Sequence, residues 1–185
     1  MDETPRDYVE RMAVEKGAVL QAALGDVVLS ADTIVDLEGK VLGKPVDDLD
    51  AWRILKLMRN KTHRVHTALS LHSGGSEEVL SDVCLSLVAM RNYSDEEIES
   101  YIERNIYRDK AGGYAIQDQG FHPVAAVQGC YANIMGLPLC HAYKLLKKAG
   151  FVPNAKIPED CQRYNQINCE VYHLILQEDH DEKTI

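Results

Sequence analysis

The sequence contains no apolar run of the roughly 18 residues that a membrane-spanning helix requires. Its first residues, Met1–Arg6, are polar and acidic, unlike the apolar core of a secretory signal. The five cysteines are odd in number and widely spaced, so they match neither a zinc site nor a disulfide framework. Unpaired thiols favour a reducing compartment. We therefore expect a cytoplasmic protein with no membrane contact.

The chain also lacks an excess of basic residues. Twenty lysines and arginines stand against 29 aspartates and glutamates, which gives a net charge of −9. This balance argues against general binding of nucleic acid, which requires a basic face. It leaves a polyphosphate substrate open, because a divalent cation can bridge carboxylates to phosphate oxygens.

Alternating helical and strand patterns predict an α/β protein. Thr4 followed by Pro5, and Ser94 followed by Glu97, are typical of helix starts. The central hairpin joined by 73–76 must be antiparallel, so we expect a mixed sheet flanked by helices rather than a pure parallel sheet. The expected helices span 4–24, 47–59, 94–105 and 137–149; the expected strands span 26–31, 62–72, 78–91 and 124–128, with a further hairpin over 33–41.

The chain divides by composition into a body of residues 1–153 and an acidic tail, 154–185. The tail is rich in Asn, Gln and acidic residues and shows little hydrophobic periodicity, which indicates poor order or loose docking. An additional edge strand is the alternative, because 171–176 is apolar. The body, at 153 residues, is long enough to bury a core of its own.

Four polar segments within the body indicate a nucleotide phosphate site. The most informative joins an acid, a base and two adjacent glycines, which allow a positive φ and close approach to a ligand. By itself, such a loop is more often a simple turn. The four segments are Ala31-Asp32-Thr33, Gly43-Lys44-Pro45, Thr62-His63-Arg64-Val65-His66-Thr67 and Asp109-Lys110-Ala111-Gly112-Gly113-Tyr114-Ala115-Ile116-Gln117.

These segments, in this order and followed by Gly136-Leu137-Pro138-Leu139, resemble the Maf family of nucleoside triphosphate pyrophosphatases. The resemblance covers about residues 1–152. It implies a fold like that of Maf proteins and inosine triphosphatases, a Mg²⁺ or Mn²⁺ cofactor, and a possible homodimer. It further implies hydrolysis of a nucleoside triphosphate to the monophosphate and pyrophosphate, in the branch that acts on dTTP and UTP.

The resemblance also implies roles for individual residues. Asp32 is the leading acid–base candidate and a metal ligand, with Glu3 as a second metal ligand. We expect His63 to border the site, and at least one of His63 and His66 to lie on the surface because they alternate with Val65 on a strand. Residues i and i+3 of a strand face opposite sides, which argues against a metal shared by the two histidines. The complete set is catalytic Asp32, Lys44 and Gln117; substrate-binding Lys16, Thr33, Thr67 and Lys110; and metal-binding Glu3 and Asp32.

The sequence departs from the family pattern at its start. The family's first strand and its Ser-x-Ser-Pro-Arg-Arg phosphate loop have no counterpart here. The resemblance therefore predicts a shortened form with weakened activity, since removing one donor of transition-state charge costs about 10²–10³ in rate. Two alternatives stay open: a catalytically silent relative that binds nucleotide or protein, and a related enzyme that removes deaminated purine triphosphates.

Overall fold

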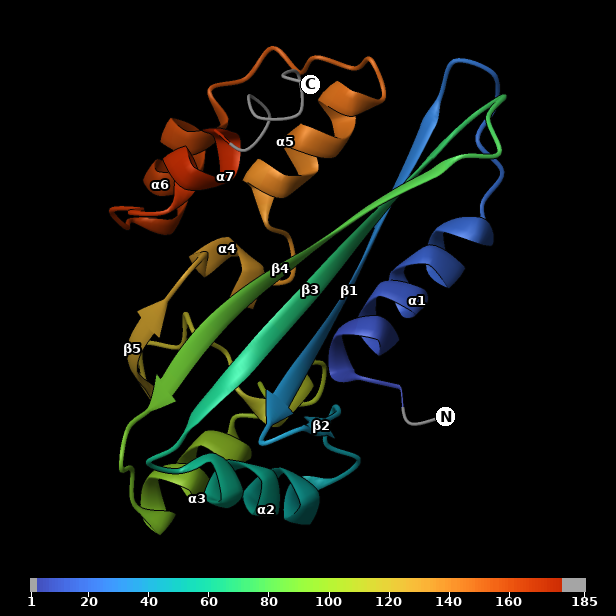
Figure 1. The fold of residues 1–185 in the computed structure, drawn as a ribbon. Helices are drawn as coiled ribbons and strands as arrows, with labels where there is room; N and C mark the ends of the chain where they lie inside the picture. The colour runs from blue at the N-terminus through green and yellow to red at the C-terminus, as the bar shows by residue number, and fades with distance from the viewer. Residues whose placement is uncertain (1–2, 178–185) are drawn as a thin grey trace.

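A computed structural model describes residues 3–177 as one antiparallel sheet flanked by helices (Figure 1). The strand order is β2-β1-β3-β4-β5, and each of the described pairings is antiparallel. The expected α/β class is confirmed. The elements are α1 (Pro5–Ala18), β1 (Val27–Leu37), β2 (Lys40–Leu42), α2 (Asp48–Met58), β3 (Thr62–Ser73), β4 (Val79–Met90), α3 (Asp95–Glu103), η1 (Ala111–Gly113), β5 (Val124–Gln128), α4 (Tyr131–Ile134), α5 (Leu139–Lys148), α6 (Ile157–Asn165) and α7 (Tyr172–Gln177).

Strand β1 is longer than the sequence predicts. It pairs with β3 from Val27 opposite Ser73 to Asp36 opposite Arg64, without interruption. The expected strand end at Asp32 is therefore wrong, because Asp32 lies in mid-strand opposite Ala68. The hairpin expected over 33–41 is present, with β2 returning along β1 as its short partner.

The two faces of the sheet carry different helices. One face of β1 and β3 packs against α1, and this interface includes Val9, Ala13, Ile34 and Ala68. The opposite face packs against α5 around Leu69 and Leu71, and further along against α2 and α3. Figure 1 shows α1 and α5 on opposite sides of the long β3–β4 ribbon, with α2 and α3 at one end. The alternation of side chains along each strand produces this division.

Helix α1 begins as the sequence predicts but ends earlier. The Thr4 hydroxyl accepts a hydrogen bond from the Asp7 amide at 3.2 Å, and Pro5 occupies the first turn. The helix ends at Ala18 rather than 24, and residues 21–23 have no regular structure. No helix within residues 3–177 is long and apolar enough to cross a membrane.

The tail beyond residue 153, for which composition favours little order, contains two short helices in its described part. Helix α6 has Pro158 in its first turn, and its Cys161 is buried against the sheet with Cys84 and Cys130. Helix α7 covers the apolar residues 172–177, so this stretch is helical rather than an edge strand. The acidic residues 178–185 lie outside the described part of the chain.

The largest core cluster joins α2 and α3 to the sheet. Leu55 is fully buried with Met58 and Tyr101. The Tyr93 hydroxyl, also buried, donates to the Leu55 carbonyl oxygen at 2.7 Å. Tyr107 and Tyr114 belong to the same cluster, which therefore supports the glycine-containing segment 109–117 that follows α3.

Truncation of Leu55 tests this core. Leu55→Ala leaves a cavity and should lower the free energy of unfolding by about 2–5 kcal/mol in denaturant titrations. Leu49 lies on the same helix but is 66% exposed, so Leu49→Ala should change the free energy of unfolding by about 0.5 kcal/mol or less. Equal losses in the two variants would contradict the assigned packing of α2.

Candidate active site

A cavity of about 450 Å³ lies beside β1, where six separate parts of the chain meet. Strand β2 pairs with β1 only at Val35–Leu37, and within residues 3–177 no strand covers the same edge of β1 at Ala31–Thr33. Side chains from mid-strand therefore reach the cavity. Six of the eight predicted site residues line it: Lys16, Asp32, Thr33, Lys44, Lys110 and Gln117.

Asp32 and Lys16 form an ion pair at one wall of the cavity. The Asp32 side chain is 15% exposed, whereas half of the Lys16 side chain is accessible. Helix α1 can bring Lys16 this close because Gly17 lies directly over the sheet. A Cβ atom on Gly17 would be 2.3 Å from the His72 ring nitrogen. The Ser30 hydroxyl, which donates to the Ala13 carbonyl oxygen at 2.6 Å, fixes the helix to β1.

Thr33 and Thr67 link β1 to β3 on the other side of the sheet. Their hydroxyl oxygens are 2.9 Å apart, and Thr67 donates to the Asn133 carbonyl oxygen at 2.9 Å. Thr67 itself is buried behind the cavity lining. It therefore supports Thr33 and the α4 segment, whose Gly136 reaches the cavity.

Asn133 is a structural residue of the site that the sequence reasoning missed. Its side-chain nitrogen donates to the Val65 carbonyl oxygen at 3.0 Å and to the Ser86 hydroxyl at 2.8 Å. The residue is fully buried, and its position three residues before Gly136 in a matched motif was the available signal. It anchors the α4 wall to β3 and β4.

The glycine segment forms the opposite wall together with the loop that carries Lys44. The Gly112 amide donates to the Gly43 carbonyl oxygen at 3.0 Å, which joins the two loops. Gly112 and Gly113 both have φ near +70°, as the sequence predicts for adjacent glycines. A Cβ atom on Gly113 would lie 2.9 Å from the Pro45 ring. At position 113, glycine is therefore required both by the positive φ and by the close approach of the Pro45 ring.

Of the two lysines in this wall, one forms an ion pair within the described part of the chain and the other does not. Lys110 donates to Asp109 at 2.7 Å, and this hydrogen bond holds the pKa of the Asp109 carboxyl below its usual value. Lys44 is exposed and forms no ion pair with any carboxylate in the described residues 3–177. Three lysines and two aspartates line the cavity, so positive charge is in excess there although the whole chain is acidic.

His63 and His66 are both buried, so the expectation that at least one is a surface residue is wrong. The His63 ring nitrogen Nε2 is 2.9 Å from the Tyr114 hydroxyl, and Tyr114 lines the cavity. His66 instead lies 3.4 Å from Asp36. His63 therefore borders the site only through Tyr114, and the two histidines have separate partners.

Glu3 lies outside the cavity lining. Arg11 binds its carboxylate through two hydrogen bonds of 2.8 and 2.9 Å, one to each oxygen. The same contact lowers the pKa of the exposed Glu3 carboxyl. A metal-binding role for Glu3 would require its carboxylate to leave Arg11, and it stays a prediction.

Comparisons with known proteins identify the family of the chain. The sequence family described as Maf-like protein matches residues 1–149. The chain belongs to the Maf family. The match to this family ends close to residue 152, where the resemblance in the sequence was expected to end.

Several Maf relatives bear the name dTTP/UTP pyrophosphatase. The relative from Dictyoglomus turgidum is 41% identical over 149 residues, covering 80% of this chain and 77% of its own length. The relative from Thermomicrobium roseum is 42% identical over 164 residues, covering 86% and 74%. The relative from Anaeromyxobacter dehalogenans is 44% identical over 151 residues, covering 80% and 76%.

The burial of His63 makes the stability of this Maf protein depend on pH. Burial lowers the pKa of His63 to about 4, against the opposing effect of Asp36. The unfolded chain therefore binds a proton at a higher pH than the folded chain does. Above pH 6.5, His63 is neutral in both states and the folded protein has its full stability. As pH falls from 6.5 towards 4, the unfolded chain takes up a proton first, and the resulting loss in the free energy of unfolding grows to about 3 kcal/mol.

Comparison with His63→Gln isolates this contribution, because glutamine can still donate to the Tyr114 hydroxyl but does not titrate. Unfolding free energies measured between pH 7.5 and 4.5 should fall more steeply for the wild type than for the variant. Parallel pH profiles would show that His63 is not the neutral buried group described above.

Proposed function

We propose that this chain hydrolyses dTTP and UTP between the α and β phosphates, releasing the nucleoside monophosphate and pyrophosphate. The observation that carries the proposal is the single cavity in which the Asp32 carboxylate meets the amines of Lys16, Lys44 and Lys110. The names of the 41–44% identical relatives support the choice of pyrimidine nucleotides.

The lysines suit a triphosphate because they come from different directions. Lys16 lies on α1, Lys44 on the loop after β2, and Lys110 before the glycine turn. Amines fixed around one space can neutralise the non-bridging oxygens of successive phosphates. They also hold the chain extended, so that the bond to be cleaved is presented to a water molecule in line.

A divalent cation fits this donor set. Mg²⁺ is commonly held by one or two carboxylates together with phosphate oxygens and water, rather than by a protein cage. Residues 3–177 contain no group of three or more metal-binding side chains, so Asp32 would hold the ion together with substrate oxygens and water. When bound, the ion would supply charge neutralisation on the phosphate oxygens.

Asp32 and Gln117 supply the remaining functions in this proposal. Asp32 would accept the proton of the attacking water at a carboxylate oxygen. Gln117 is exposed within the cavity and carries both a donor and an acceptor, so it can orient the water or a phosphate. A cytoplasmic location and a homodimer, both expected from the sequence, complete the proposal.

Removal of the Asp32 charge gives the decisive test. Asp32→Asn should lower pyrophosphate release from dTTP and UTP by at least about 10²-fold with Mg²⁺ or Mn²⁺ present. Asp160 provides a matched control, since it lies on α6 in an exposed ion pair with Arg163 and Asp160→Asn should retain wild-type rates. Inosine triphosphate in the same panel distinguishes the purine-directed alternative.

A wild-type chain that binds UTP but releases no pyrophosphate would overturn the proposed activity. That result would favour the catalytically silent relative. Equal rates for wild type and Asp32→Asn would remove Asp32 from the reaction.

Lys44 should contribute mainly to phosphate binding. Lys44→Ala removes one charge-assisted hydrogen bond and should lower kcat/KM for UTP by about 10- to 100-fold. Lys40→Ala, on the exposed neighbouring strand, should change it less than about twofold because Lys40 does not line this cavity. Similar losses in both variants would indicate a general charge effect rather than a specific contact.

A further inference from the structure

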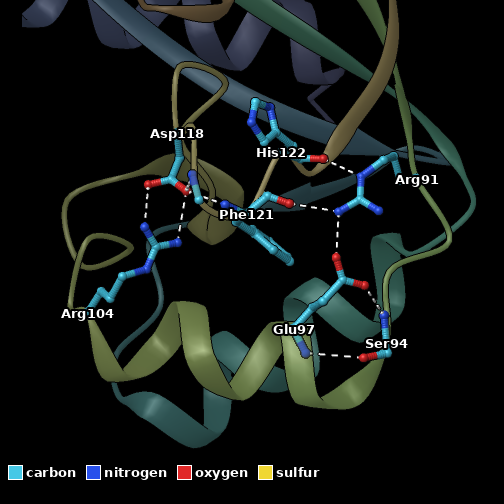
Figure 2. Close-up of polar contacts among 8 residues, drawn as sticks. Arg91, Ser94, Glu97, Arg104, Asp118, Phe121 and His122 are labelled. Atoms are coloured by element: carbon cyan, nitrogen blue, oxygen red, sulfur yellow. Dashed lines mark hydrogen bonds and ion pairs between the residues drawn. The ribbon is translucent and has the colours of Figure 1, made fainter.

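The segment that carries Gln117 is attached to the end of α3 by a bidentate ion pair (Figure 2). Arg104, which caps α3, donates from Nη1 and Nη2 to the two oxygens of Asp118, at 2.9 and 2.8 Å. Such paired hydrogen bonds fix the relative orientation of both groups as well as their distance. Asp118 is the residue that directly follows Gln117.

Asp118 also closes the turn after Gln117. Its Oδ1 atom accepts hydrogen bonds from the Gly120 amide at 3.1 Å and the Phe121 amide at 2.6 Å. The Asp118 side chain is only 8% exposed. Although burial opposes its charge, the hydrogen bonds from Arg104 and the Phe121 amide lower its pKa. One carboxylate therefore holds both the turn and its contact to α3.

Helix α3 makes a second contact on the other side of Gln117. The Tyr101 hydroxyl, one turn before the end of α3, accepts a hydrogen bond from the Ala115 amide at 3.1 Å. The Tyr101 ring stacks on Phe121, with ring centres 4.6 Å apart and planes 21° apart. The backbone is thus fixed two residues before Gln117 and again at residues 118–121.

Arg91 holds the outgoing end of the same segment, as Figure 2 shows. Its side chain donates to the carbonyl oxygens of Phe121, at 2.7 Å, and His122, and forms an ion pair with Glu97. Glu97 in turn accepts from the Ser94 amide in the capping box of α3. Both ends of α3 are therefore used to hold one irregular segment.

We propose that Arg104 and Asp118 are positioning residues that hold the Gln117 amide in the cavity. This inference rests on the proposed function. Neither Arg104 nor Asp118 lines the cavity, so they act through the backbone of Gln117. Residues 114 and 115 have no regular secondary structure and 116–117 form a turn, so no helix or strand fixes Gln117. A displacement of about 1 Å of a positioned group costs about 10²-fold in rate.

A double-mutant cycle with Gln117 separates positioning from general stability. Arg104→Ala should lower kcat/KM for UTP by about 10- to 100-fold in the wild-type background. In a Gln117→Ala background the same change should have almost no further effect, because the group that Arg104 positions is already absent. Arg104→Lys keeps the charge but loses the bidentate geometry, so it should recover only part of the rate.

The control removes an arginine that is unrelated to the cavity. Arg163 forms an exposed ion pair with Asp160 on α6, and Arg163→Ala should retain wild-type kinetics in both backgrounds. Equal losses from Arg104→Ala with and without Gln117 would show a merely structural role and overturn the inference. Wild-type activity of Gln117→Ala would overturn it as well.

Hydrogen exchange provides a readout that needs no activity. Arg104→Ala should speed exchange of the amides of residues 115–121, while amides of β3 stay as protected as in the wild type. Unchanged exchange over 115–121 would overturn the inference even if the enzyme is active. If Arg104→Ala speeds exchange at residues 115–121 but the wild type releases no pyrophosphate, the proposed function would be refuted. The attachment of this segment by Arg104 and Asp118 would still stand.

Discussion

The cavity depends on the register in which β1 and β3 pair. Successive side chains of a strand point to opposite faces, so a shift of one residue would move Asp32 to the face that Thr33 now occupies. Pairing over the whole length from Val27 to Asp36 prevents this shift, because each displaced residue would also move apolar groups out of the core. Only in the observed register does Asp32 face α1 and meet Lys16.

The other walls are held in place by directional hydrogen bonds as well as by apolar packing. Asn133 fixes the α4 segment to β3 and β4, and the Gly112 amide fixes the glycine turn to the Lys44 loop. Because a buried polar group that loses its partner costs about 1–3 kcal/mol, each contact strongly favours one position of its loop. These hydrogen bonds therefore fix the positions of side chains on segments that have no regular secondary structure.

The sequence predicted most of the fold because its signals there are local. Capping residues, alternating apolar residues and the glycine pair specify elements through interactions within a few positions. The wrong predictions concern features that depend on contacts between residues far apart in the sequence. Asp32 resembles a strand end, but pairing with Ala68 carries the strand past it. His63 resembles a surface residue, but Tyr114, far along the chain, covers it. Asn133 has partners that only the folded sheet supplies.

The tail illustrates a different limit. Its composition lacks periodicity, yet Cys161 on α6 completes a small apolar cluster with Cys84 and Cys130. Cys161 is the single buried residue of α6, and α7 has none, so almost no periodic pattern indicates this docking.

The charges in the cavity are arranged for exchange of partners. Lys16 is paired with Asp32 and Lys110 with Asp109, so each of these charged groups has a partner of opposite charge. In the proposed reaction, a triphosphate would bring negative charge for the lysines, and its cation would bring positive charge for Asp32. The Lys16–Asp32 ion pair would then be replaced by two interactions, one from Lys16 to phosphate and one from Asp32 to the metal. Neither partner alone would achieve this: a free triphosphate would meet the aspartates, and a free cation would meet the lysines. In this proposal, the arrangement would favour the metal–nucleotide complex over either component, because charges of opposite sign are paired at one site.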